Sequence, residues 1–194
     1  IWLAGQVVYI VCATAIYTVA ILLSTILICG QRCYVGNIWS ETAVKLAFTS
    51  AGKKLSLAAS EKTLELTRPY ACMTTIFFLL FAYALVMVLL IFWFRILWNE
   101  LAGMIAGVVF NGISFIFSPG ILQKLLGISE RKSYLANVAA GWISPLSHAT
   151  YHLHNFGYDR LPSLRDSGIY GMVLVIVLIL LNLYSIRTYH FVFD

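Results

Sequence analysis

The chain has 194 residues, of which 61% are hydrophobic and only 11% charged, and its mean hydropathy is +0.88. Soluble domains carry roughly 45–50% apolar and about 25% charged residues. A fold of this length has too little interior to bury the additional apolar residues. The composition therefore excludes a soluble globular protein. Lys and Arg exceed Asp and Glu by 13 to 8, but they lie in short stretches between apolar runs, so we expect contact with a lipid bilayer and not with nucleic acid.

The first apolar run covers residues 1–29 and contains no charged residue. About 20 apolar residues cross the roughly 30 Å core of a bilayer as one helix, so we expect a span here. Its Ser and Thr hydroxyls are expected to bond back to helix carbonyls. Because the run lacks a basic n-region and a cleavage site, we do not expect a signal peptide, and we expect the chain to be the later part of a longer protein.

The connection over residues 30–70 carries six basic and three acidic residues and mixes apolar with polar positions. We expect it to lie at the membrane interface, with Trp39 as an anchor at headgroup level. The second span is expected over about 71–95, after Pro69, because proline suits the first turn of a helix.

A tight polar turn follows the second span. It contains Arg95, Asn99 and Glu100, and it marks the edge of the bilayer before a third span over about 101–118. Ionisable groups near a membrane are often functional, but a simple turn explains these three residues better.

Three residues inside the third span suggest contact with another helix. Gly103 and Gly107 are four residues apart, which lets a second helix approach closely. Asn111 lies in mid-span. We take it as a candidate for a transport path, although a hydrogen bond between helices explains it equally well.

The region 119–160 is too interrupted for another span. An amphipathic piece is expected over 121–132, and Gly141, Pro145 and His148 break the moderately apolar stretch that follows. Irregular backbone at membrane depth is tolerated only where protein buries it or where it lines water. We therefore expect a re-entrant or interfacial helical pair here, followed by a final span over about 168–187.

These elements predict one transmembrane domain over residues 1–194, all-α and integral to the membrane. It has about four transmembrane helices plus the broken re-entrant helical pair. An even number of spans puts both ends of the chain on the same side.

Three histidines, His148, His152 and His154, lie close together in the sequence. A pair at i, i+4 can bind zinc, but the general-base Glu that follows the first His in metalloproteases is Ala149 here. The chain also has no nucleophile elbow, no Gly-rich phosphate loop and no paired carboxylates. We expect no metal and no catalytic residue, and the alternative is an integral membrane metalloenzyme that uses the three histidines.

The order of the elements resembles the C-terminal two thirds of a type-2 permease of the ATP-binding cassette (ABC) transporters, which has six spans in each half. Five segments carry the resemblance: Asn37–Ser40, Ala47–Gly52, the turn at 95–100, Phe117–Gly120 and Trp142–Ser147. The resemblance implies a re-entrant break at Pro119, Gly120, Ser144 and Pro145.

The resemblance also implies a function. The chain is expected to be a multi-pass permease subunit of a bacterial cell membrane that forms the path of an exporter and is not itself an enzyme. ATP and Mg²⁺ are expected on separate cytosolic ATP-binding subunits, with no cofactor in this chain, and a second permease subunit completes the path. An accessory membrane subunit without a path of its own is a further possibility.

Two arguments disagree on sidedness. Eleven of the 13 basic residues lie in the two long connections, 30–70 and 119–167, and the positive-inside rule places such connections in the cytoplasm. The resemblance places them outside and puts the turn from Arg95 to Glu100 at the cytosolic surface. We follow the resemblance and expect Cys33, Lys53 and Lys54 to face the outside.

Overall fold

A computed structural model of the chain describes residues 2–29, 31, 35–39, 41, 45, 67–117, 121, 127, 130–155 and 160–188. Its elements are α1 (Trp2–Cys29), α6 (Pro69–Leu97), α7 (Glu100–Ile116), α9 (Glu130–Ile143), α10 (Pro145–Ala149), the 3₁₀ helix η1 (Tyr151–Leu153) and α11 (Leu164–Thr188). No strand occurs among the described residues, so the all-helical prediction is confirmed for this part of the chain.

Three of the described helices are long and apolar enough to cross a membrane: α1 over Ala4–Ser24, α6 and α11. This is the pattern of a transmembrane protein. The remaining apolar helix, α7, has 17 residues, which makes it about 26 Å long at 1.5 Å per residue. It falls short of a hydrocarbon core of roughly 30 Å, so the fourth span stays a prediction.

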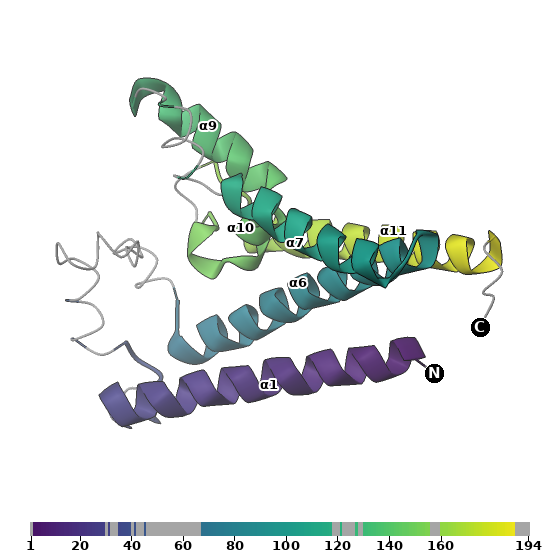
Figure 1. The fold of residues 1–194 in the computed structure, drawn as a ribbon. Helices are drawn as coiled ribbons and strands as arrows, with labels where there is room; N and C mark the ends of the chain where they lie inside the picture. The colour runs from purple at the N-terminus through teal and green to yellow at the C-terminus, as the bar shows by residue number, and fades with distance from the viewer. Residues whose placement is uncertain are drawn as a thin grey trace.

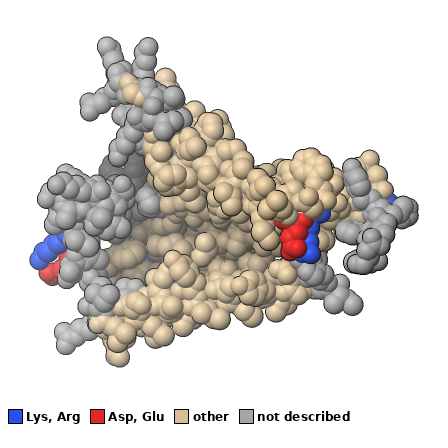
Figure 2. Space-filling model, in the orientation of Figure 1, with Lys and Arg blue, Asp and Glu red and all other residues tan. Residues whose placement is uncertain are grey.

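Helix α6 lies between α1 and α11, and the ends of the described helices fall into two groups (Figure 1). Helix α1 begins and α11 ends at the right of the view, where α6 also gives way to α7. The end of α1, the start of α6, α9 and α10 lie at the left. The described charged residues lie at the two ends of the face in Figure 2, and the helices between them present other residues.

The main apolar core joins α6 to α11. Val86, Leu89 and Leu178 are buried there, and neighbouring apolar side chains from α6, α7 and α11 pack around them. Two polar contacts cross the same interface. Asn182 Nδ2 donates to the Leu89 carbonyl at 3.0 Å, and Trp93 Nε1 donates to Ser185 Oγ at 3.1 Å.

Helix α1 packs along α6, and three of its hydroxyl groups donate to carbonyls of the same helix. Thr14 Oγ1 donates to the Ile10 carbonyl at 2.7 Å, Thr18 Oγ1 to the Thr14 carbonyl at 2.8 Å, and Ser24 Oγ to the Ala20 carbonyl at 2.7 Å. These bonds confirm the expected hydroxyl pairing within the first run.

Two hydrogen bonds tie the residues after α1 to Thr67 and to the start of α6. Trp39 Nε1 donates to the Thr67 carbonyl at 2.8 Å, and the Tyr70 amide donates to Asn37 Oδ1 at 3.2 Å. The expected anchoring role of Trp39 at a headgroup stays a prediction.

Several sequence predictions fall outside the described residues. They concern Cys33, Lys53, Lys54, the segment Ala47–Gly52, the break at Pro119 and Gly120, and most of the amphipathic piece over 121–132.

Candidate functional site

The turn between α6 and α7 is built around a helix cap. Asn99 Oδ1 accepts a hydrogen bond from the Ala102 amide at 2.8 Å, which satisfies one of the unpaired amides at the start of α7. Arg95 Nη2 lies 3.9 Å from Glu100 Oε1, with the two side chains 47% and 65% exposed. An ion pair this exposed contributes about 0–1 kcal/mol, so the cap does more than the ion pair to define the turn.

The two glycines of α7 face α6 at close range. A Cβ atom at Gly103 would lie 2.7 Å from the Ile91 carbonyl oxygen, and one at Gly107 would lie 3.0 Å from the Ile91 side chain. A larger residue at either position would push the two helices apart. The prediction that this pair permits close helix approach is confirmed.

Asn111 links α7 to α6. Tyr83 Oη donates to Asn111 Oδ1 at 2.6 Å, and Asn111 Nδ2 donates to the Gly107 carbonyl at 3.2 Å and lies 3.6 Å from Met87 Sδ. This geometry fits the interhelical interpretation of Asn111. Its place in a transport path stays a prediction.

The bend between α9 and α10 occurs at Ser144 and Pro145. Ser144 is fully buried, and its Oγ donates to the Ser114 carbonyl near the end of α7 at 2.7 Å and accepts from the Ser147 amide at 3.3 Å. Pro145 is the first residue of α10, where its missing amide proton costs nothing. The bend thus fixes α10 to α7 and turns it toward α6 and α11.

Beyond this bend, two histidines converge on one serine. His148 Nδ1 and His154 Nε2 each lie 2.8 Å from Ser167 Oγ. His148 Nε2 lies 3.0 Å from the Trp142 carbonyl oxygen, and His154 Nδ1 lies 3.0 Å from that of Tyr151. We call His148, His154 and Ser167 the His–Ser–His cluster. Its three side chains are 2–5% exposed, and it joins α10 and the end of η1 to the start of α11.

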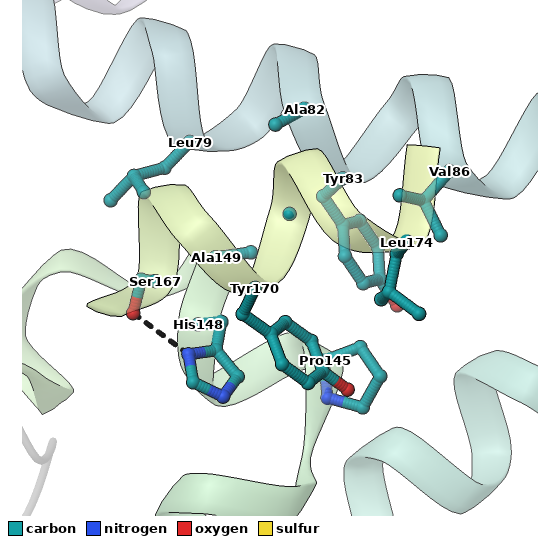
Figure 3. Close-up of a pocket in the computed structure, with 11 residues that line it drawn as sticks. Leu79, Ala82, Tyr83, Val86, Pro145, His148, Ala149, Ser167, Tyr170 and Leu174 are labelled. Atoms are coloured by element: carbon teal, nitrogen blue, oxygen red, sulfur yellow. Dashed lines mark hydrogen bonds between the residues drawn. The ribbon is translucent and has the colours of Figure 1, made fainter. Parts of the chain in front are cut away.

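A cavity of about 30 Å³ lies beside the cluster, between α6, α10 and α11. By this measure a water molecule needs about 10–15 Å³. Figure 3 shows His148, Ser167, Tyr170 and Tyr83 around it. The Tyr170 ring stacks on the His148 ring, with centroids 4.0 Å apart and planes at 17°. The cavity therefore has room for a water molecule, although its lining is mostly apolar.

The surroundings of His148 act on its pKa in both directions. Burial lowers the pKa of His148, while its hydrogen bond to the Trp142 carbonyl and the negative charge of Asp166 act in the opposite direction. Burial is the largest of these effects, so His148 favours the neutral form.

The metalloenzyme alternative needs ring nitrogens that are free to bind a metal. All four ring nitrogens of His148 and His154 lie within hydrogen-bond distance of an oxygen atom. The part of the chain that the structure describes contains no group of three or more His, Cys, Asp or Glu side chains placed to hold a metal, and the His152 side chain lies outside it. The expected absence of a metal stays a prediction.

Comparison of the chain with models of protein families, with curated proteins and with solved structures finds no match.

Sequence reasoning missed the partners of the histidines. The sequence predicts a last span that begins at about residue 168, whereas α11 begins at Leu164. Ser167 therefore lies within the first turns of the helix, where it faces His148 and His154. Ser167 is separated from the two histidines by 19 and 13 residues. These separations match no helical or strand period, so the contact cannot be predicted from residue spacing.

Proposed function

We propose that this chain is a permease subunit of an ABC transporter, an exporter of a bacterial cell membrane. The observation that carries the proposal is the placement of the connections. The tight turn between α6 and α7 lies at one end of the helices, and α10, the second helix of the bent pair, packs at the other end against α6, α7 and α11. This order and arrangement support the resemblance in the sequence.

In this function the chain carries out no covalent chemistry. ATP and Mg²⁺ bind to separate cytosolic subunits, and a second permease subunit encloses the path together with this one. The chain contributes contacts to the substrate that differ between the inward-facing and outward-facing states, because a ligand shifts such an equilibrium only by its differential affinity.

The proposed orientation puts the turn from Arg95 to Glu100 in the cytosol, next to the ATP-binding subunits. The half-exposed charges of this turn stay hydrated there and tolerate a modest rearrangement at low cost. The bent pair α9–α10 and the His–Ser–His cluster then lie at the outer surface.

Purification from native membranes tests this function. We expect the tagged protein, extracted in a mild detergent, to bring down an ATP-binding chain in equimolar amount and to hydrolyse Mg-ATP. Replacing the phosphate-binding lysine of that partner should abolish hydrolysis and leave co-purification unchanged.

Two results would contradict the proposal. The first is an intact, folded protein that purifies without any ATP-binding chain. The second is a stoichiometric transition metal that is lost in His154→Ala, because that result favours the metalloenzyme alternative.

A further inference from the structure

A groove larger than the cavity at the His–Ser–His cluster lies on the surface that α6 and α11 share. It is lined by residues within 74–85 of α6 and 164–176 of α11, and its volume is about 620 Å³. Pockets that bind small molecules have volumes of roughly 300–1,000 Å³. Gly168 takes part in the lining, and no atom lies within 4 Å of a Cβ atom added there. We call this hollow the α6–α11 groove.

The α6–α11 groove offers a ligand mainly apolar surface. Most of the side chains that line it are those of Leu, Phe, Val, Ile, Met and Ala. Thr74 and Thr75 each donate to the carbonyl four residues earlier in α6, at 2.9 and 2.8 Å. The Ser167 hydroxyl is turned toward His148, 2.8 Å from its Nδ1 (Figure 3). Because these polar groups have partners within the protein, the groove suits a hydrocarbon chain.

The length of the α6–α11 groove matches one leaflet of a bilayer. At 1.5 Å per residue, its lining extends about 16–18 Å along the two helices, and one leaflet contributes about 15 Å of the roughly 30 Å hydrocarbon core. Past the inner end of the groove the helices close on each other: Leu89 and Leu178 are buried, and Trp93 Nε1 donates to Ser185 Oγ. A lipid tail ends at the bilayer centre, whereas a membrane-spanning helix continues across it. The groove therefore has the length of a lipid tail and not of a further helix.

Exposed arginines lie at the outer end of the groove. Arg165, the second residue of α11, is exposed. It precedes the lining residues Met172 and Ile176 by seven and eleven residues, which puts all three on one face of the helix at 100° per residue. Arg68, also exposed, immediately precedes α6. No carboxylate of the described residues lies within ion-pair distance of either guanidinium group.

The acidic residue in the first turn of α11 faces another way. The Asp166 carboxylate accepts from the Ser163 amide at 2.9 Å and from the Ser163 hydroxyl at 2.7 Å. Asp166 also lies four residues before Tyr170, whose ring stacks on His148 of α10, so it lies on the α10 side of α11. The outer end of the groove is therefore positively charged, and a guanidinium group pairs with a phosphate through two parallel hydrogen bonds.

We propose that the α6–α11 groove is a binding site for an anionic phospholipid. One acyl chain lies along the groove against Phe78 and Met172, and the phosphate lies at Arg165. Arg68 adds positive charge at the level of the headgroups. Basic sites between membrane helices bind anionic headgroups in this way. The site concerns lipid contact alone, so it holds in either orientation of the chain and does not rest on the transport function.

A photoreactive side chain in the groove tests which lipid lies there. A benzophenone amino acid replaces Met172, which is 62% exposed, in the full protein. The protein is reconstituted in nanodiscs of equimolar phosphatidylglycerol and phosphatidylcholine with the same acyl chains, and mass spectrometry counts the adducts. The control carries the same amino acid in place of Leu23, which is 54% exposed and near the end of α1 that lies beside the start of α6. We expect phosphatidylglycerol adducts to exceed phosphatidylcholine adducts about five-fold at Met172, as one arginine near an anionic headgroup provides, and the two to be nearly equal at Leu23.

Two further variants separate the groove from the headgroup contact. Gly168→Leu fills the groove, and Gly112→Leu on α7 is the matched control, because no atom lies within 4 Å of an added Cβ at either position. We expect Gly168→Leu and Arg165→Gln each to bring the adduct ratio at Met172 down to that at Leu23, and Gly112→Leu to leave it unchanged.

Three results would overturn the proposal. The first is the same adduct ratio at Met172 and Leu23, a comparison that decides the question by itself if Gly168→Leu does not fold. The second is an unchanged ratio in a folded Gly168→Leu protein. The third comes from irradiation in native membranes, where we expect lipid adducts at Met172: a crosslink to a second copy of this chain, or to another protein, would show that protein covers the groove.

Discussion

At the scale of single residues, two buried polar side chains connect one helix to another. Asn182 binds the Leu89 carbonyl across the α6–α11 interface, and Ser144 binds the Ser114 carbonyl between the bend and α7. Without water in the surrounding hydrocarbon, such groups must find partners within the protein. Each bond also fixes the rotation of a helix about its axis, which apolar contacts alone leave looser.

The hydrogen bond between Tyr83 and Asn111 tests this view. The side chains meet at 2.6 Å between α6 and α7, and interhelical hydrogen bonds in membranes contribute about 0.6 kcal/mol on average. We expect a double-mutant cycle of Tyr83→Phe and Asn111→Leu to give a coupling free energy of about this size, measured by thermal unfolding in detergent.

The same variants test whether Asn111 lies in the transport path. If it faces the path, Asn111→Leu should also impair export or change substrate preference at normal complex yield, whereas Tyr83→Phe alone should change export less. Additive stability effects in the cycle would contradict the structural contact, and normal transport by Asn111→Leu would remove Asn111 from the path.

At the scale of elements, close packing of α6 and α7 depends on two residues without side chains. Gly103 leaves room for the Ile91 carbonyl, and Gly107 leaves room for the Ile91 side chain. The Asn99 cap starts α7 immediately after the turn, so the first residues of α7 pack against the last turns of α6. The hairpin is thus fixed by its turn and by its glycine contacts together.

Replacing Gly103 by Ala should separate the two helices. The added Cβ would lie 2.7 Å from a backbone oxygen, and overpacking of this kind costs about 1–3 kcal/mol. Gly112→Ala in the same helix is the matched control, because no atom lies within 4 Å of its added Cβ, and Ala gains about 0.8–1.0 kcal/mol of helix propensity over Gly. Thermal unfolding in detergent measures both variants, and a Gly103→Ala protein as stable as Gly112→Ala would contradict the packing.

The sequence predicted elements better than it predicted their contacts. Apolar length alone located α1, α6 and α11, because a run of about 20 apolar residues has few alternatives to a membrane helix. The sequence marks Asn111 as a residue of either a transport path or an interhelical contact. It does not indicate the partner, Tyr83, because 28 residues separate the two. The contacts of Ser167 are not predicted from the sequence for a similar reason: its partners lie on segments that follow the bend at Ser144, and hydropathy does not indicate that bend.

At the scale of the whole molecule, the arrangement of the connections determines how the chain can lie in a membrane. The start of α1 and the end of α11 lie at the same end, with the α6–α7 turn (Figure 1). Both long connections leave from the opposite end. The predicted four spans put 11 of the 13 basic residues on one side of the membrane, so a single labelled position decides the orientation.

Cys33 offers that position. In a protein whose Cys12, Cys29 and Cys72 are replaced by Ser or Ala, we expect a membrane-impermeant thiol reagent to label Cys33 in intact cells, as the proposed permease orientation requires. A protein that also lacks Cys33 is the control for background labelling. Labelling only after permeabilisation would show that the positive-inside rule holds here and that the orientation is reversed.

The central claim is that ATP on a partner subunit drives this chain between two states, and movement at the α6–α7 turn tests it most directly. Trp98, just before the Asn99 cap, is 69% exposed and suits a spin label attached through Trp98→Cys in a cysteine-free protein. Distances between the turns of the two permease subunits are measured in the reconstituted complex by pulsed dipolar spectroscopy, without nucleotide and with Mg-ATP trapped by vanadate. We expect the distance distribution to shift between these conditions, as rigid-body switching requires, and not to shift when the ATP-binding subunits are omitted. The same distribution in both conditions, in a complex that hydrolyses ATP, would contradict the account.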